Sequence, residues 1–391
     1  MRNPMAAVVA GALALALVAS CGSDDPSSSA TSASVAGATT TAAGATTTAA
    51  PAAGISAAGI SQERCDANKD AGTITYLSGF DFAAAASILD VVVAKDRGYF
   101  DALCLDVTIK PSFTTSNYPL VAGGQAQFGA AGSYTEMLNY SKGGAKFIAV
   151  VDYGKIPVEA LVVPADGDVQ TLQDLKGKTI GIKSDLPPSL VAMLAQAGLQ
   201  RGKDYKEVLL DGFDPVSQLK TGIDALPVYK SNEPAQLDRA GVKYRLFDPV
   251  SYAIPGSFGV IYTTPDFFAE HPTAVQDFVR ASFKGYADAV ADPAGAVAVS
   301  IKEINAAGNQ NFLSVEGETF RWQQESAIVA RGTPPGRPPG LIDGTILDAE
   351  VASYAKANIF PSGAPATTGT YEAGPGQAVI GPDGALVWPS A

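Results

Sequence analysis

From residue 73 onward the chain alternates short apolar runs with segments of helical periodicity, and few folds accommodate this pattern. Residues 73–78 predict a strand. Residues 84–97 predict a helix, because apolar side chains recur there at helical spacing and Gly98 can end it. Further short strands and helices are predicted in turn at residues 105–110, 118–122, 126–131, 133–141 and 145–151. This alternation is typical of an α/β fold with mainly parallel sheets.

A second α/β unit starts near Pro164. Its strands and helices are predicted at residues 179–183, 188–197, 207–210, 215–221, 223–228 and 244–247. The chain returns to the first unit around residues 252–263, and long helices follow at residues 272–291, 294–306, 318–331 and 342–357. Two such units joined by two crossings would bring the carboxyl ends of their strands to one shared cleft, where open α/β sheets bind ligands.

The N-terminus has the features of an export signal. Arg2, an apolar run at residues 5–18 and small residues before Cys21 predict a secretory signal and not a membrane span. The order Val-Ala-Ser-Cys that ends at Cys21 resembles a bacterial lipobox, whose cysteine is lipidated; an ordinary signal with a chance cysteine is the alternative. Residues 22–59 are almost wholly Ser, Thr, Ala, Gly and Pro, which predicts a flexible linker over residues 22–62. The lipid would anchor the chain to the outer face of the cytoplasmic membrane.

Two cysteines remain when Cys21 is lipidated. Cys65 and Cys104 form an even pair in an oxidising compartment, which predicts a disulfide between the start of the folded body and a nearby strand. Two buried free thiols are the alternative.

Charge and side-chain chemistry exclude several classes of function. The formal net charge is −12 at pH 7, so nucleic acid and an anionic membrane surface would repel the chain. His271 is the only histidine and no cysteines cluster, which excludes Cys/His metal chemistry and a Ser-His-Asp triad. We expect no enzyme, metal or cofactor, although hydrolysis by carboxylates alone stays open.

Several short motifs occur in order over most of the folded body. They are Ala-Lys-Asp-Arg-Gly-Tyr-Phe at 94–100, Leu-Cys-Leu-Asp-Val at 103–107, Ala-Gly-Gly-Gln-Ala-Gln-Phe-Gly at 122–129, Asp-Leu-Lys-Gly-Lys-Thr-Ile-Gly at 174–181, Thr-Gly-Ile-Asp-Ala at 221–225 and Tyr-Lys-Ser-Asn-Glu-Pro at 229–234. Through them the chain resembles the type II periplasmic binding proteins of the group that serves thiamine-pyrimidine precursors, riboflavin, nitrate, taurine and alkanesulfonates. The resemblance covers about residues 73–360, and Leu103 stands where that group often has a glycine.

The resemblance implies a two-lobed type II fold, with two mainly parallel sheets, flanking helices and a two-stranded hinge. Lobe 1 would comprise residues 63–163 and 253–360, lobe 2 residues 164–252, and residues 361–391 a Gly/Pro-rich tail that is extended or disordered. It also implies a monomeric solute-binding component of an ABC importer, whose partners are a small solute, a permease and an ATPase. A sensor that has lost transport, and an enzyme on the same fold, are the alternatives.

The loop after the first strand contains the first candidate ligand residues. Phe80 and Phe82 flank Asp81, so the rings could stack on a planar solute while the carboxylate accepts from ring N–H groups. The alternative is that one Phe belongs to the core and Asp81 only caps the following helix.

Further candidates open helices or follow predicted strands. Ser133, Tyr134 and Thr135 open a helix in the first unit, and Ser184 and Asp185 do so in the second, with capping alone as the alternative. Residues that follow strands and could close over a solute are Tyr153, Tyr229, Asn232 and Tyr252. The segment at 229–234 resembles most closely the thiamine-pyrimidine-precursor branch, which implies that Glu233 faces the amino groups of a heterocycle.

The charges of the predicted cleft loops bear on the ligand class. These loops contain Lys183 and Lys230 and no Arg, against the carboxylates of Asp81, Asp185 and Glu233. Nitrate or a sulfonate would favour more cationic donors. A neutral or partly cationic planar heterocycle is the better prediction, with a pyrimidine precursor first and a flavin or another aromatic solute next.

Overall fold

The computed structural model describes residues 60–308 and 314–389. The predicted signal segment, Cys21 and nearly all of the predicted linker lie outside the described residues. The folded body begins earlier than residue 63, because Ile60 is buried and helix α1 (Gln62–Asp70) starts with Ser61 as its N-cap. No helix within the described ranges is long and apolar enough to cross a membrane.

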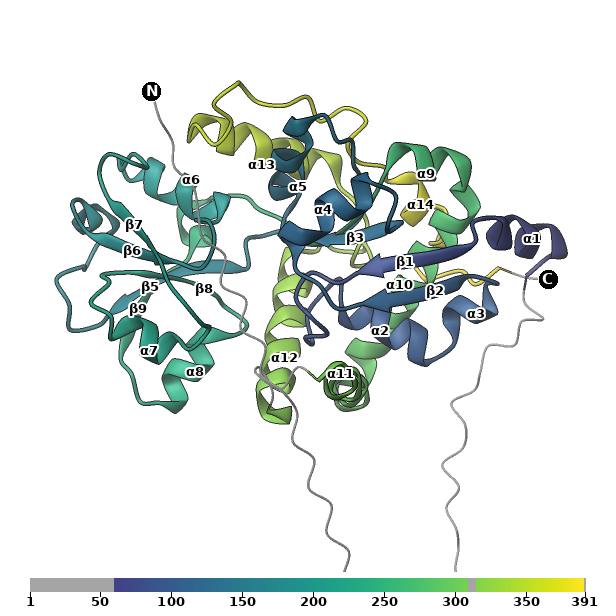
Figure 1. Ribbon diagram of the computed structural model, residues 1–391, viewed down its shortest axis with the longest axis horizontal. Helices are drawn as coiled ribbons and strands as arrows, with labels where there is room; N and C mark the ends of the chain where they lie inside the picture. The colour runs from purple at the N-terminus through teal and green to yellow at the C-terminus, as the bar shows by residue number, and fades with distance from the viewer. Residues whose placement is uncertain (1–59, 309–313, 390–391) are drawn as a thin grey trace, which may run out of the picture. The chain divides into compact units, whose positions relative to one another are not determined.

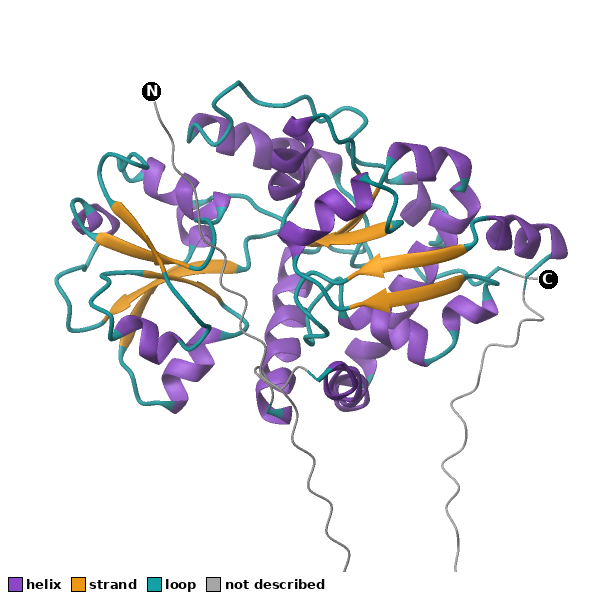
Figure 2. Cartoon of the chain, viewed as in Figure 1, coloured by secondary structure: helices purple, strands orange, loops and turns teal. Residues whose placement is uncertain are grey.

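Three sheets form the framework (Figures 1 and 2). The largest has the strand order β2-β1-β3-β10-β4, with bounds β1 (Thr73–Leu77), β2 (Asp106–Lys110), β3 (Phe128–Ala131), β4 (Ile148–Gly154) and β10 (Phe258–Thr263). A three-stranded sheet has the order β8-β5-β9, with bounds β5 (Glu159–Pro164), β8 (Leu226–Tyr229) and β9 (Tyr244–Phe247). A two-stranded sheet consists of β6 (Thr179–Ile182) and β7 (Lys206–Leu209).

The predicted α/β class is confirmed, but the sheets are mixed rather than mainly parallel. β1 pairs parallel with β2 and β3, and β6 pairs parallel with β7. β10 and β5 instead run antiparallel to both of their neighbours. The reason is that β5 and β10 are the first strands after the chain crosses between sheets, over residues 155–158 and 248–257, so each enters its new sheet reversed. Pairing puts β5 in the three-stranded sheet, so that sheet begins before the predicted boundary at residue 164.

Helices flank the sheets (Figure 2). Those packed with the five-stranded sheet and its neighbours include α2 (Leu89–Asp96), α3 (Tyr99–Ala102), α4 (Thr114–Ala122), α5 (Tyr134–Tyr140), α9 (Pro265–Glu270), α10 (Pro272–Ala291), α11 (Pro293–Ala307), α12 (Val315–Gly332) and α14 (Gly374–Gln377). The others are α6 (Pro188–Gln196), α7 (Pro215–Leu219), α8 (Glu233–Arg239), α13 (Gly344–Lys356) and the short 3-10 turns η2 (Ser141–Gly143), η3 (Leu172–Leu175) and η4 (Pro249–Tyr252).

The main core lies between the five-stranded sheet and helices α2 and α10. Phe278 of α10 stacks on Phe128 of β3, with ring centroids 4.1 Å apart, and on Phe100, with centroids 5.2 Å apart. Helix α10 approaches α2 closely because Gly285 has no side chain: a Cβ there would lie 2.0 Å from the carbonyl oxygen of Asp90. The apolar spacing that predicted these helices therefore corresponds to real packing.

The predicted disulfide between Cys65 and Cys104 is present and joins α1 to the segment just before β2, with a Cα–Cα distance of 5.2 Å. The structure corrects one detail of the motif. Leu103 has a φ of −100°, an ordinary value, whereas Cys104 has a φ of +57°, in the left-handed region that favours glycine. Cys104, not Leu103, therefore stands at the position where a glycine would be expected.

The C-terminal tail packs as an extended strap, which was one of its two predicted forms. Strand β4 lies at the edge of the five-stranded sheet, and the strap pairs with it: Ala149 N donates to Thr370 O at 3.0 Å and Glu372 N donates to Ala149 O at 2.8 Å. Further along, Val379 is fully buried in the main core. The tail is thus part of the folded body.

Candidate functional site

Three phenylalanine rings meet at loops of two sheets. The Phe80 ring, which follows β1, lies edge-to-face against Phe113, with centroids 5.5 Å apart, and against Phe213, with centroids 6.0 Å apart. Phe113 precedes α4 and is 42% exposed, while Phe213 lies between β7 and α7 and is 43% exposed. We call these three residues the aromatic cluster. Neighbouring exposed rings of this kind mark a surface that binds something apolar or planar.

Two cations lie over the aromatic cluster. Lys183, which follows β6, has its Nζ 5.5 Å from the Phe213 centroid, and the guanidinium of Arg321 on α12 is 5.9 Å from the Phe80 centroid. Such contacts favour the cation because the face of an aromatic ring is negative. Two of the three rings therefore already have a positive charge over them.

Both cations are paired with carboxylates. Lys183 Nζ forms an ion pair with Glu233 Oε1, and Glu233 Oε2 accepts a hydrogen bond from Tyr229 N at 2.8 Å. Glu233 is almost fully buried. Arg321 Nη1 donates to both carboxylate oxygens of Glu318, at 2.6 and 2.7 Å. Protein carboxylates therefore already neutralise both cations, which disfavours an anionic solute.

Acidic side chains lie near Tyr229. The Tyr229 side chain is 47% exposed, and yet surrounding protein, followed by the carboxylates of Glu159 and Glu136, raises the pKa of its phenol. Burial likewise raises the pKa of Glu136 and of Glu159. The side chains near this phenol are therefore acidic, which favours a solute with hydrogen-bond donors over an anion.

The structure brings four of the predicted ligand residues to this region: Phe80, Tyr229, Asn232 and Glu233. Asn232 Oδ1 accepts a hydrogen bond from Arg321 Nη2 at 3.2 Å. Asp81 lies directly beside Phe80, with a φ of +46°, and its N donates to Ser112 O at 2.9 Å. The alternative that Asp81 caps the next helix is wrong, because the N-cap of α2 is Ile88.

Four other predicted residues are buried and do not join the aromatic cluster. Phe82 packs with Ile88 and Val92, so the alternative of a core Phe is confirmed. The remaining three donate to protein groups: Tyr134 N to Ser257 Oγ at 2.8 Å, Thr135 Oγ1 to Glu350 Oε1 at 2.5 Å and Tyr153 Oη to Asp90 Oδ2 at 2.8 Å. The sequence could not reveal these partners because each lies far away in the chain.

Ser133 and Tyr252 have structural contacts. Ser133 Oγ accepts from Glu136 N at 3.1 Å, so it caps α5 as the alternative interpretation held. Tyr252 ends η4, packs partly buried against the second core cluster, and accepts from Gln196 Nε2 through its carbonyl oxygen at 3.1 Å.

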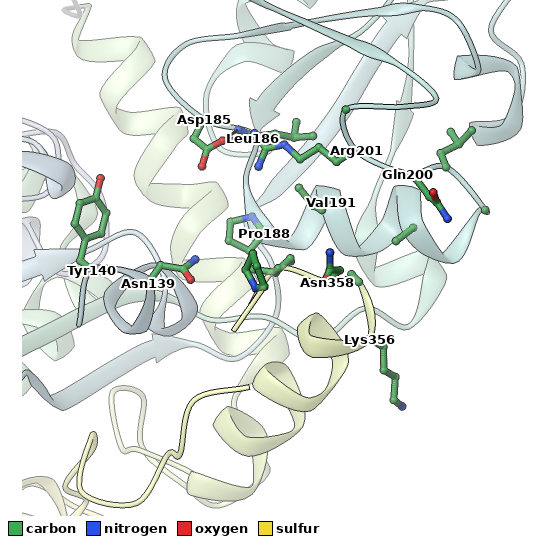
Figure 3. A pocket seen from close by; sticks show the side chains of 17 residues that line it. Asn139, Tyr140, Asp185, Leu186, Pro188, Val191, Gln200, Arg201, Lys356 and Asn358 are labelled. Atoms are coloured by element: carbon green, nitrogen blue, oxygen red, sulfur yellow. Dashed lines mark hydrogen bonds and ion pairs between the residues drawn. The ribbon is translucent and has the colours of Figure 1, made fainter. Parts of the chain in front are cut away.

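Ser184 and Asp185 are exposed, and Asp185 lines a separate pocket of about 910 Å³ (Figure 3). Residues of α5, α6, the turn after α6 and the end of α13 form its wall. Arg201 at its rim forms ion pairs with Asp185 and, at 2.7 Å, with Glu207. The pocket does not include the aromatic cluster among its lining residues.

Sequence reasoning missed Phe113, Phe213 and Arg321. The two phenylalanines had a usable signal, since each is a lone aromatic residue in a polar segment between a strand and a helix. Arg321 had none, because it lies inside a helix and reaches the loops only through the fold. The absence of Arg from the predicted cleft loops was therefore no guide to the cations present.

Comparisons with known proteins agree with this architecture. A family model described as NMT1/THI5 like matches residues 85–296. The riboflavin-binding protein RibY of Chloroflexus aurantiacus is 27% identical over 267 residues, covering 64% of this chain and 72% of that protein. The alkanesulfonate-binding protein SsuA of Xanthomonas axonopodis pv. citri, solved with MOPS, has a TM-score of 0.55 at 18% identity, covering 75% of this chain and 94% of that one. The periplasmic aliphatic sulphonate-binding protein SsuA of Escherichia coli has a TM-score of 0.56 at 14% identity, covering 74% and 87%. At these identities the two solved structures show a shared fold.

Proposed function

This chain belongs to the NMT1/THI5-like family, and on that basis we propose that it binds a planar nitrogen heterocycle outside the cytoplasm and delivers it to an ABC importer. The class is that of a solute-binding protein of the ABC-importer type, and the relatives are binding proteins rather than enzymes. The proposal adds the solute, a monomeric state, anchoring through Cys21, and a permease and an ATPase as partners.

The observation that supports this ligand class is the aromatic cluster. Phe113 and Phe213 expose more than two fifths of their surface beside Phe80, and such rings favour stacking on a planar solute. The carboxylates near Tyr229 favour a solute with ring N–H donors. An anionic solute fits less well, because Lys183 and Arg321 are engaged by Glu233 and Glu318.

Among planar heterocycles, a flavin is favoured. Its tricyclic ring offers more area to several phenyl faces than a single pyrimidine does, and a relative is named as a riboflavin-binding protein. The pyrimidine precursor remains the second candidate, supported by the carboxylates around Tyr229. For that solute, Glu233 would have to exchange its contacts with Lys183 and Tyr229 N for the amino group.

Fluorescence quenching and thermal shift test the proposal. The folded body is titrated with riboflavin, hydroxymethyl-aminopyrimidine, taurine, ethanesulfonate and nitrate. We expect riboflavin fluorescence to be quenched by stacking, and the melting temperature to rise by mass action with riboflavin and not with the anions. A shift with the pyrimidine alone would replace the flavin by the second candidate. A shift with an anion alone would contradict the ligand class.

A substitution connects binding to the aromatic cluster. Phe213→Ala removes one stacking face and should weaken riboflavin binding about tenfold. Tyr140→Ala is the matched control: Tyr140 is 41% exposed, close to the value for Phe213, but it stacks on Tyr118 outside the cluster. Equal affinities of the two variants would refute the role of the cluster.

A further inference from the structure

Helix α12 presents a buried charged stripe to the candidate site. Glu318, Arg321 and Glu325 follow at helical spacing on one side of the helix, and their exposed fractions are 0%, 6% and 7%. Charged side chains are rarely buried to this degree unless they are paired. Trp322 fixes the same helix to α10, since its indole Nε1 donates to Ala289 O at 2.8 Å.

The carboxylate of Glu325 holds two segments that are far apart in the sequence. Its Oε2 accepts from Ala86 N at 2.7 Å, in the segment that follows β1 of the five-stranded sheet. Its Oε1 accepts from Ser231 Oγ at 3.1 Å, in the segment that follows β8 of the three-stranded sheet. Ser231 is 1% exposed, so water does not replace this contact easily.

A second bridge runs parallel to the first. Glu318 Oε2 accepts from Ala84 N at 2.8 Å, and Glu318 is paired with Arg321. Arg321 Nη2 donates to Asn232 Oδ1 at 3.2 Å, while its guanidinium lies over the Phe80 ring. Both bridges therefore start in the segment after β1, pass through α12 and end in the segment after β8.

We propose that this stripe of α12 is a clasp that closes the solute site. Glu325 and Arg321 are positioning residues: they fasten Ser231 and Asn232 to the segment that contains Phe80 and so keep Phe80 against Phe213. The solute leaves only after the clasp opens. The identity of the solute rests on the proposed function, but the clasp itself is built wholly from contacts between protein groups.

Solute release distinguishes a clasp from ordinary structural support. Ser231→Ala removes one hydrogen bond to the buried carboxyl group of Glu325, and we expect it to speed the release of riboflavin about tenfold in stopped-flow fluorescence. Ser326→Ala is the matched control, because Ser326 lies on the same helix but its Oγ donates to Trp322 O at 2.7 Å, within the helix. A double-mutant cycle with Glu325→Gln should show that the two substitutions are not additive.

Hydrogen exchange in the solute-free protein separates this proposal from the proposed function. With the clasp, Ser231→Ala speeds amide exchange at Ala86 and over residues 229–233, and Ser326→Ala does not. This exchange result is expected whether or not a heterocycle binds. If no heterocycle binds, the proposed function is refuted but the clasp is not. If Ser231→Ala matches Ser326→Ala in exchange, the clasp is refuted, whichever solute binds.

Discussion

At the scale of single residues, the most unusual groups are three buried carboxyls that form no ion pair within the part of the chain that the structure describes. Burial raises the pKa of Asp90, of Glu325 and of Glu350 to about 7. Between about pH 4 and pH 7 the native state therefore keeps protons that the unfolded chain has lost. The unfolding free energy then falls as pH rises through this window, and the loss is complete above about pH 7.

Asp90→Asn tests this linkage. The amide stays neutral at every pH and preserves the shape beside Tyr153, so the fall in unfolding free energy between about pH 4 and pH 7 should become less steep. Urea denaturation at a series of pH values measures the effect. Glu270→Gln, at an exposed carboxylate, should keep the wild-type slope. A wild-type slope in Asp90→Asn would show that Asp90 keeps no such proton.

Single residues were also where prediction from the sequence worked least evenly. Phe80, Tyr229 and Asn232 were identifiable because they follow predicted strands, and the ends of strands meet in this class of fold. Glu233 was identifiable only through the family resemblance. Tyr134 and Thr135 follow the same rule but are held by Ser257 and Glu350, which come much later in the chain. Tyr153 lies inside β4 and donates to Asp90, which comes earlier. The local sequence pattern predicts that a residue lies at the end of a strand. It does not predict which distant residues will bury that side chain.

At the scale of elements, the contact of α2 with α10 depends on one glycine. Gly285→Ala should be destabilising by several kcal/mol, although alanine favours a helix by about 1 kcal/mol, because its Cβ would overlap the backbone of α2. Gly317→Ala in α12 is the control, since the nearest atom there is Ser314 Oγ at 3.1 Å. Thermal unfolding should give a much lower melting temperature for Gly285→Ala than for Gly317→Ala. Similar melting temperatures would contradict the close approach of α2 and α10.

The disulfide makes a second prediction for elements. It joins residues 39 positions apart, so replacing both cysteines by serine should lower the unfolding free energy by about 3–4 kcal/mol through the entropy of the unfolded chain. Chemical denaturation of the oxidised protein and the double variant measures the difference. A reductant should produce the same loss in the wild type and none in the variant. An unchanged midpoint would show that α1 is held by its other contacts, such as the ion pair of Arg64 with Asp277.

Elements were predicted better than their pairing. The apolar runs located most strands, because each run is long enough to cross a sheet once. The apolar runs did not predict that β5 and β10 are antiparallel to their neighbours. Strand direction depends on where the chain crosses from one sheet to the other. Helix α1 was missed because only Cys65 and Asn68 face inward, which leaves no apolar stripe.

At the scale of the whole molecule, the C-terminal strap contributes to stability. Val379 is 0% exposed in the core, whereas Val387 on the same strap is 46% exposed. Val379→Ala should therefore cost about 2 kcal/mol, and Val387→Ala less than about 0.5 kcal/mol. Urea unfolding compares the two variants. Equal small losses would show that the strap is only loosely attached.

The strap also covers an edge of the five-stranded sheet. β4 is an edge strand, and an open edge invites other strands to add to it. Gly340 and residues 370–372 are what cover that edge, through Asp152 and Ala149. Without residues 370–372 this part of the edge would be unpaired and open to strands of other chains. Residues 370–372 therefore keep a second copy of the chain from adding a strand at this part of the edge.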